Sequence, residues 1–300
     1  MRSTKPRPYN ARETILAYLF LAPFLILFLG FIVLPAFQSL LYSFTQWEGI
    51  GPKKWVGFDN YVNIFSGDDV FWQAMGHNAL WMVLSLTFPI AISLWVSNAL
   101  VRNISHGAKY YQMILFLPQV LASVVVSTIW KWIYNPVFGP VSQLMNALGL
   151  KKLAVSGMLG QPGLVMYALF VVSLWSGIGY YTVIFSSAMQ GLDPTLYDAA
   201  SIDGCGRARQ FFAVTLPGIR NTMTTILLLA IIGSFQVFDL VATMTNGGPG
   251  YNSYVISFYV YREGFINNRM GYATALSIVL SAFLMVVSKT FTAIRERGDY

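Results

Sequence analysis

The chain has 300 residues, of which 56% are hydrophobic and only 10% are charged. A water-facing surface needs about 25% charged residues, so this composition excludes an ordinary soluble protein and predicts an integral membrane protein. The same composition disfavours disorder, and it disfavours nucleic-acid binding as the main function despite a formal net charge of +7. The single cysteine, Cys205, excludes an internal disulfide and a cysteine-based zinc site.

The uncharged windows between clusters of charge predict the membrane spans. A spanning helix needs about 20 predominantly apolar residues. Six windows meet this requirement, at residues 15–35, 74–100, 110–130, 164–189, 222–244 and 270–288. They are continuously apolar, which favours helices over alternating barrel strands. The predicted fold class is therefore all-α, a polytopic membrane protein with six transmembrane helices.

The segments outside these windows are predicted to be tails and loops. Residues 1–13 and 292–300 are expected to be tails on either side of a single membrane domain at 14–291. The first window is too long for a signal peptide and lacks a small-x-small cleavage site, so we expect a retained helix. At 132–150, prolines and glycines interrupt an uncharged stretch, which predicts an external loop with short helical pieces.

The positions of lysine and arginine predict the orientation. With six spans both termini lie on one side, and twelve of the 19 basic residues fall on that side. The other seven are Lys53, Lys54, Lys131, Lys151, Lys152, Arg262 and Arg269. Cytoplasmic segments carry the excess of positive charge, so we expect both termini in the cytoplasm.

The segment at 191–221 is far longer than a connector between two spans requires. Asp193 and Pro194 predict a helix start, because aspartate is a good N-cap and proline suits the first helical position. The helix is expected to run to about Ile202, and Gly204 suits a left-handed cap. A second helix is then expected until Pro217 interrupts it.

The first of these two helices presents small and acidic side chains. Ala199 and Ala200 form a small-residue surface beside Asp198 and Asp203, where the backbone of another protein can approach closely. The same pattern also fits a capped amphipathic connector with no partner. The residues by themselves leave both interpretations open.

This loop resembles the coupling loop of inner-membrane permease subunits of binding-protein-dependent ABC importers, the EAA loop. The family pattern has E-A-A, then D-G-A, then apolar residues ending in L-P. Ala199, Ala200, Asp203, Gly204 and Pro217 match it, within the sequence DAASIDGCGRARQFFAVTLP. Asp198 stands where the family most often has glutamate, and Cys205 where it usually has alanine.

Two further segments resemble carbohydrate importers of the maltose and glycerol-3-phosphate type. One runs over residues 238–277 and contains Thr245, Gly247, Gly248 and Pro249. The other is WVGFDNYVNIF at 55–65, and the Leu-Pro within 116–118 is also similar. The resemblance therefore covers most of the chain and implies the type I permease fold of ABC importers, in the bacterial cytoplasmic membrane.

The resemblance implies a machine of several parts, of which this chain is one. The expected partners are a second, non-identical permease subunit, two cytoplasmic ATPase subunits and an external solute-binding protein, with this chain as the first permease of the pair. The chain has no G-x-x-x-x-G-K-[ST] loop, so ATP and magnesium are expected to bind the ATPase subunits. The chain itself is expected to bind no cofactor and to catalyse no reaction. Residues 198–204 would couple ATPase closure to movement of the spans.

The substrate path is sought in small and polar residues at helical spacing within spans. The fourth window offers Ser173, Ser176, Gly177 and Tyr180, and the fifth offers Ala230, Gly233, Ser234 and Val237, with Gln236 and Asp239 nearby. In the resembled family the matching faces line the substrate cavity, with sugar as the expected substrate. Small residues at this spacing also form helix-packing seams, and Asp239 can simply reach water at the outer end of its span.

Other side chains give no site, and two alternatives to a sugar permease remain. His77 and His106 have no metal-ligand spacing. Import of glycerol-3-phosphate or another phosphorylated solute would require a basic residue in the cavity, and the fourth and fifth windows contain none. A membrane-embedded enzyme or secondary carrier would require a catalytic cluster or a carboxylate relay, and Asp239 is the one acidic residue available.

Overall fold

A computed structural model describes residues 11–102 and 107–297. His106 and parts of both predicted tails lie outside these residues. Helices dominate the described chain, and the π-helical segments are labelled η. The first half contains α1 (Ala11–Phe28), η1 (Leu29–Val33), α2 (Leu34–Tyr42), β1 (Thr45–Gln46), β2 (Lys54–Trp55), α3 (Asp59–Ser66), α4 (Asp69–Arg102), α5 (Ala108–Val120), α6 (Ser123–Ile133), α7 (Pro140–Ala147) and α8 (Lys151–Ser156). The second half contains α9 (Val165–Gln190), α10 (Pro194–Ile202), α11 (Arg207–Gln210), η2 (Phe211–Thr215), α12 (Leu216–Gly218), α13 (Arg220–Phe235), α14 (Asp239–Met244), α15 (Ile256–Tyr261), η3 (Arg262–Ile266) and α16 (Met270–Arg297).

The membrane spans follow the predicted windows. Five helical stretches in the described chain are long and apolar enough to cross a membrane, and a sixth is present if the bent pair α5 and α6 counts as one span. The five stretches are 18–42, 69–102, 165–190, 220–244 and 270–295. The predicted loop at 132–150 contains α7 and, just beyond it, α8, as short helical pieces. The last helix continues to Arg297, into the segment that the sequence predicted as a tail.

The third window is not the straight helix that its sequence predicted. α5 and α6 meet at an angle of 95°. Pro118 lies in the last turn of α5, where it has no N–H to donate to the carbonyl four residues earlier. Leu121 and Ala122 then adopt extended backbone angles, and the helix restarts at Ser123.

The fifth window is also interrupted, between α13 and α14. A continuing helix would use the carbonyls of Ser234 and Phe235 to accept the N–H groups of residues 238 and 239. Instead, Asn78 Nδ2 donates to Ser234 O at 2.8 Å, and Ser257 Oγ donates to Phe235 O at 2.8 Å. Val237 therefore lies beyond the end of α13. The prediction that it shares one helical face with Ala230, Gly233 and Ser234 is wrong for this residue.

The core forms where α4 packs along α9, the most extensive helix pair in the described chain. Ser93 Oγ donates to Ile178 O at 3.0 Å, and Ser97 Oγ donates to Thr182 O at 2.9 Å. Small hydroxyl side chains let two helices approach while also joining them by hydrogen bonds. α5 packs on the other side of α9, where a Cβ on Gly179 would lie 2.0 Å from Leu115 O.

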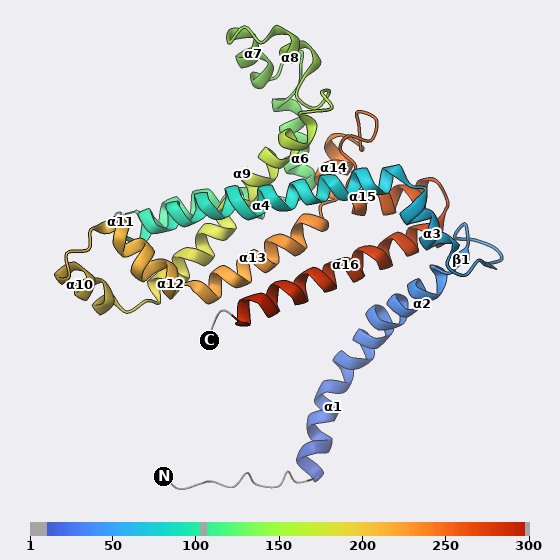
Figure 1. Cartoon of the computed structure of the whole chain (residues 1–300), viewed down its shortest axis with the longest axis horizontal. Coiled ribbons are helices and arrows are strands. Elements are labelled where there is room, and N and C mark those ends of the chain that lie inside the picture. The colour runs from blue at the N-terminus through green and yellow to red at the C-terminus, as the bar shows by residue number, and fades with distance from the viewer. Residues whose placement is uncertain (1–10, 103–106, 298–300) are drawn as a thin grey trace.

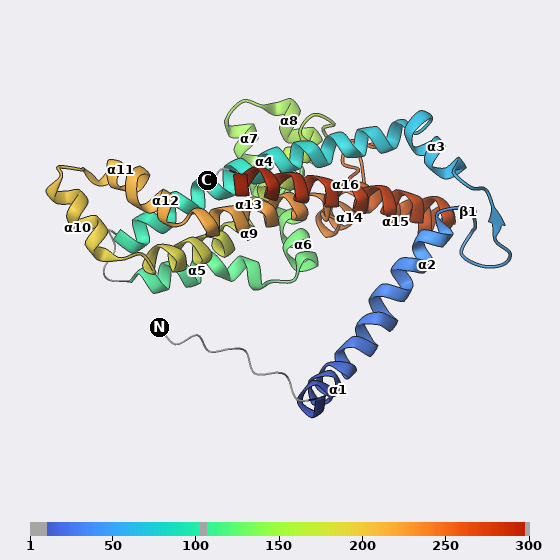
Figure 2. The ribbon, with the colours of Figure 1, turned by 60° about the horizontal axis from the view of Figure 1, so that its bottom comes forward.

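Figure 1 shows the loop segment α10–α12 at one end of the bundle and α3 with the strand hairpin at the opposite end. The helices α7 and α8 project from the bundle as a separate pair. The first span also leaves the bundle, and Figure 2 confirms that α1 stands apart from the other helices in a second view. None of the most apolar part of this span is buried within the chain, whereas α2 reaches α16 near its end.

We predict that Gly179→Ala destabilises the bundle, because the new methyl group would overlap the backbone of α5. Overpacking of this kind costs about 1–3 kcal/mol, and the measurement is the unfolding temperature of the purified protein in detergent. The matched control is Gly76→Ala in α4, where a Cβ meets nothing within 4 Å. An equal unfolding temperature for the two variants would show that α5 does not approach α9 this closely.

Candidate coupling loop and transport path

The helix α10 begins as its sequence predicts. The Asp193 carboxylate accepts the backbone N–H of Thr195 at 2.9 Å, and Pro194 occupies the first helical position. This hydrogen bond from the backbone holds the pKa of Asp193 below its usual value. The carboxylate therefore stays charged at the helix N-terminus, where it also complements the helix dipole.

The helix ends in a Schellman motif built around Gly204. The N–H of Cys205 donates to Ala200 O at 2.9 Å, and that of Gly204 donates to Ser201 O at 3.1 Å. Gly204 has a φ of +75°, which is the left-handed conformation expected for it. A Cβ there would meet nothing within 4 Å, so the backbone angle and not the available space requires glycine.

The second arm of the loop is a single bent helical segment made of α11, η2 and α12. It does not stop before Pro217 but includes it, because the wider π-helical turn over Phe211–Thr215 precedes the proline. Leu216 donates its N–H to Phe211 O, five residues earlier. Such a bulge accommodates the missing N–H of Pro217 without ending the helix.

Gln210 joins the two arms of the loop to the end of α4. Its side chain is buried, and its Nε2 donates to Ser201 Oγ at 2.8 Å and to Cys205 O at 3.1 Å. Its Oε1 accepts from Arg102 Nη2. The Arg102 guanidinium also lies 4.6 Å from the ring centroid of Tyr197 in α10. The loop is therefore held against a membrane span and is not a loose connector.

The outer face of α10 is left uncovered by the rest of the described chain. Asp198, Ala199, Asp203 and Gly204 are exposed, and Ala200 is half-buried. Two apolar side chains share this exposure, since Ile202 is 87% exposed and Leu196 is 50% exposed. A capped helix that presents small, acidic and apolar side chains outward has the features of a surface for another protein.

The predicted path residues divide into exposed and buried positions. Tyr180, Gly233, Gln236 and Asp239 are exposed, while Ser173, Gly177 and Val237 are half-buried. Ser234 differs from these, since it is 2% exposed and its Oγ donates to Ile231 O at 2.6 Å within its own helix. Ser234 packs against α4 and is not accessible as the other predicted path residues are.

Three contacts in the structure were not predicted from the sequence. The bond between Arg102 and Gln210 joins residues 108 positions apart, and no local pattern in the sequence indicates it. The break in the fifth span depends on Asn78, which lies 156 positions from Ser234, and on Ser257, which lies 22 positions from Phe235. His77 contacts a backbone carbonyl, Tyr254 O, at 2.8 Å. Within 11–102 and 107–297, no group of three or more histidine, cysteine, aspartate or glutamate side chains is placed to hold a metal ion.

Comparison with known proteins identifies the family. Residues 5–297 match the family described as the binding-protein-dependent transport system inner membrane component. The chain belongs to this family. It is therefore a multi-pass transport component of an inner membrane and not an enzyme, and the family predicted from residues 198–217 is confirmed.

Individual relatives of this permease agree with the family. The probable ABC transporter permease protein YurN of Bacillus subtilis is 33% identical over 92% of this chain and 94% of its own. The diacetylchitobiose uptake system permease protein NgcF of Streptomyces coelicolor is 34% identical, over 89% of this chain and 78% of its own. The sn-glycerol-3-phosphate transport system permease protein UgpA of Escherichia coli is 30% identical, over 92% of each.

A solved structure shares the fold of this permease. It belongs to a bacterial ABC transporter involved in the import of the acidic polysaccharide alginate. The TM-score is 0.84 at 25% sequence identity, and the match covers 95% of this chain and 96% of the other. The all-α permease fold expected from the resemblance is thus confirmed.

We predict that Gly204→Val leaves membrane insertion intact but lowers solute uptake by cells. A β-branched residue in the left-handed region costs about 1–2 kcal/mol, which would open the Schellman motif and turn α10 away from its position. Gly204→Asn is the matched control, because asparagine tolerates this backbone angle. Normal uptake by the valine variant, with normal protein levels, would contradict the prediction.

We also predict that Gln210→Leu loosens the coupling loop. The change leaves the Arg102 guanidinium without this acceptor, and such a loss costs about 1–3 kcal/mol. The measurement is the rate of tryptic cleavage at Arg207 and Arg209, which should rise several-fold. Combining it with Arg102→Leu should add little, because both changes remove the same bond. Fully additive effects of the two changes would contradict a direct link.

Proposed function

We propose that this permease is one of two unlike transmembrane subunits of an ATP-driven sugar importer. The observation that carries the proposal is the exposed, doubly capped α10, which is tied to the span α4 through Gln210. A rigid surface helix fixed to a span can transmit the movement of a cytoplasmic partner into the membrane. Asp198, Ala199, Ala200, Asp203 and Gly204 would form the contact.

The partner at α10 would be an ATPase subunit. The sequence contains no phosphate-binding loop of the G-x-x-x-x-G-K-[ST] type, so ATP and its magnesium would bind in that separate subunit. Coupling then works by a population shift. ATP and the loaded solute-binding protein together have to favour the outward-facing state over the inward-facing one by their differential affinity.

The lack of cover on the first span supports the proposal that a second permease is a partner. The most apolar part of the stretch at 18–42 is entirely unburied within this chain, on all its faces. A helix that stands apart from its own bundle gains packing contacts when a neighbouring subunit covers it. The resemblance to maltose-type importers implies a pair of unlike permeases, so we propose a non-identical partner.

Charge supports an orientation with both termini in the cytoplasm. Arg102, Arg207, Arg209 and Arg220 lie on α4, α11 and α13 at the end of the bundle that carries α10. Clusters of lysine and arginine mark the cytoplasmic side of a membrane protein. The hairpin, α3, α7 and α8 would then face the outside, where a solute-binding protein delivers substrate.

The sugar would pass along α9 and the broken fifth span. Tyr180, Gln236 and Asp239 are exposed there, and a tyrosine ring with amide and carboxylate groups suits the apolar faces and hydroxyls of a sugar. The interruption at 236–238 resembles other transporters, in which unwound backbone lines the substrate site. Neither 165–190 nor 221–244 contains a lysine or arginine, which favours a neutral sugar over a phosphorylated solute.

Copurification and uptake test the proposal together. A tagged permease should recover a second permease, an ATPase and a solute-binding protein, and the reconstituted complex should import a neutral sugar with ATP.

We predict that Tyr180→Ala lowers uptake at least tenfold without changing assembly, since it removes a stacking surface worth about 1.4 kcal/mol or more. The matched control is Tyr167→Ala, an exposed tyrosine on the same helix outside the proposed path.

Three results would overturn this function. They are transport by the isolated chain, recovery without an ATPase, and uptake confined to glycerol-3-phosphate. The last would favour the phosphorylated-solute alternative, which one relative carries in its name.

A further inference from the structure

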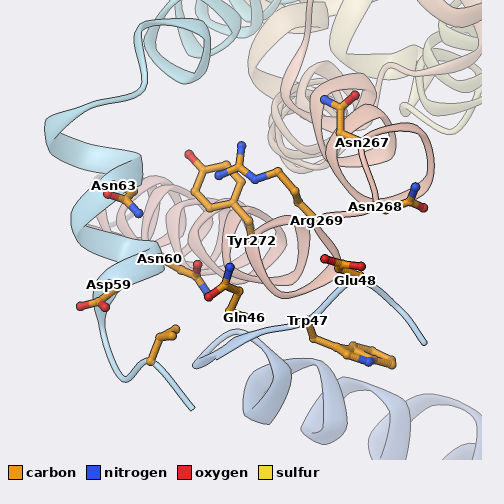
Figure 3. Close-up of a pocket in the computed structure, with 11 residues that line it drawn as sticks. Gln46, Trp47, Glu48, Asp59, Asn60, Asn63, Asn267, Asn268, Arg269 and Tyr272 are labelled. Carbon is orange, nitrogen blue, oxygen red and sulfur yellow. The ribbon is translucent and has the colours of Figure 1, made fainter. Parts of the chain in front are cut away.

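Pockets lie at both ends of the bundle, and their linings differ in chemistry. Figure 3 shows the pocket beside the strand hairpin, where most of the labelled side chains are polar. The pocket at the end that carries α10 has a volume of about 510 Å³ and a mostly apolar lining. It lies between the last turns of α4 and the second arm of the loop, α11–α12.

One wall of this pocket is a single face of α4. Ala91, Leu94, Trp95 and Asn98 line it, at the spacing i, i+3, i+4 and i+7 that places residues on one side of a helix. They belong to the apolar stretch at 69–102, so this wall lies in the membrane or at its edge. Trp95 is 73% exposed, as tryptophans at the boundary between lipid and water often are. Along this face the side chains change from apolar to polar over roughly 10 Å.

The opposite wall comes from the second arm of the loop. Phe211, Phe212 and Leu216 extend the apolar lining, and Phe212 is 66% exposed. Arg207, the first residue of α11, is the charged member of the lining and is itself exposed. Within the described chain, no acidic residue lines this pocket. The lining therefore offers an apolar surface and a positive charge to the same occupant.

Two buried polar atoms near the end of α4 lack partners. Asn98 lines the pocket, and its Oδ1 accepts no hydrogen bond within the described chain. Arg102, one turn further, donates from Nη2 to Gln210, but its Nη1 is also buried without a partner. Buried polar atoms are normally paired with protein, water or ligand. Asn98 therefore requires a hydrogen-bond donor, and Arg102 adds a second positive charge one turn away.

We propose that this pocket binds an anionic phospholipid with a hydroxyl-bearing headgroup, of the phosphatidylglycerol type. An acyl chain would lie against Trp95 and Phe212, the phosphate near Arg207, and a headgroup hydroxyl would donate to Asn98 Oδ1. Basic pockets beside membrane helices recognise anionic headgroups in this way. Phosphatidylcholine has neither a net negative charge nor a headgroup donor, so it fits less well.

The bound lipid would join the span α4 to the second arm of the loop, in addition to the link through Gln210. This goes beyond the proposed function, because the site lies at a membrane surface in either orientation of the chain. Under the proposed orientation the lipid comes from the cytoplasmic leaflet.

The test measures lipid binding to the tagged permease, with every subunit that copurifies, by native mass spectrometry. Wild type should bind phosphatidylglycerol about tenfold more tightly than phosphatidylcholine. Arg207→Gln should remove about this preference, because it removes the charge at the phosphate. The matched control is Arg209→Gln, an exposed arginine of the same helix that does not line the pocket. Equal affinities for the two lipids in wild type, or an equal loss in the control, would overturn the proposal.

A second variant, Asn98→Leu, separates binding from folding. Replacing an unpaired buried acceptor with an apolar side chain should maintain or raise the unfolding temperature without lipid. The same change should weaken phosphatidylglycerol binding, so the rise in unfolding temperature that this lipid causes should shrink. A rise as large as that of wild type would show that Asn98 does not contact the headgroup and would overturn the proposal.

A third measurement identifies the occupant. Benzoylphenylalanine in place of Phe212, irradiated in nanodiscs of equal phosphatidylglycerol and phosphatidylcholine, should crosslink mainly to phosphatidylglycerol. A crosslink to another protein subunit would overturn the proposal, since this surface would then be a subunit interface. Displacement of the lipid by soluble glycerol phosphate would also overturn it, because the pocket would then be a site for a water-soluble anion.

Discussion

Asn78 makes the contact on which the half of the bundle opposite α10 depends. Lipid offers no hydrogen bonds, so each backbone group in a span needs a partner within the protein. The buried amide of Asn78 donates to Ser234 O and accepts the N–H of Ile256 at 2.8 Å. One side chain on α4 thereby joins the end of α13 to the start of α15, and the fifth span can break within the membrane without leaving bare carbonyls.

The long helix α4 connects this break to the coupling loop. Its C-terminal end carries Arg102, which contacts Gln210 and Tyr197 of the loop. Its C-terminal third also carries Ser93 and Ser97, which bond to carbonyls of α9. An α-helix rises about 1.5 Å per residue, so the 24 positions from Asn78 to Arg102 span roughly 36 Å. The loop α10–α12 and the broken fifth span are thus attached to the same long helix, α4.

Local chemistry made the fold of the loop at 191–221 predictable from sequence. An aspartate before a proline starts a helix, and a glycine at its end adopts a left-handed angle, whatever surrounds them. The breaks in the third and fifth spans were less accessible. Pro118 signals a bend but not an angle of 95°, and the carbonyl of Ser234 is taken by a side chain 156 positions away. Ser234 itself matches a path residue in spacing, yet packing against α4 decides its burial.

The uncovered first span has a consequence for how the protein persists in cells. A helix with no buried surface in its most apolar part adds little to the stability of the lone subunit. If a second permease covers this span, as proposed, its packing energy becomes available on assembly, and the folded population then depends by mass action on the amount of partner present. An unassembled copy would leave the helix uncovered and would be the form that proteases remove.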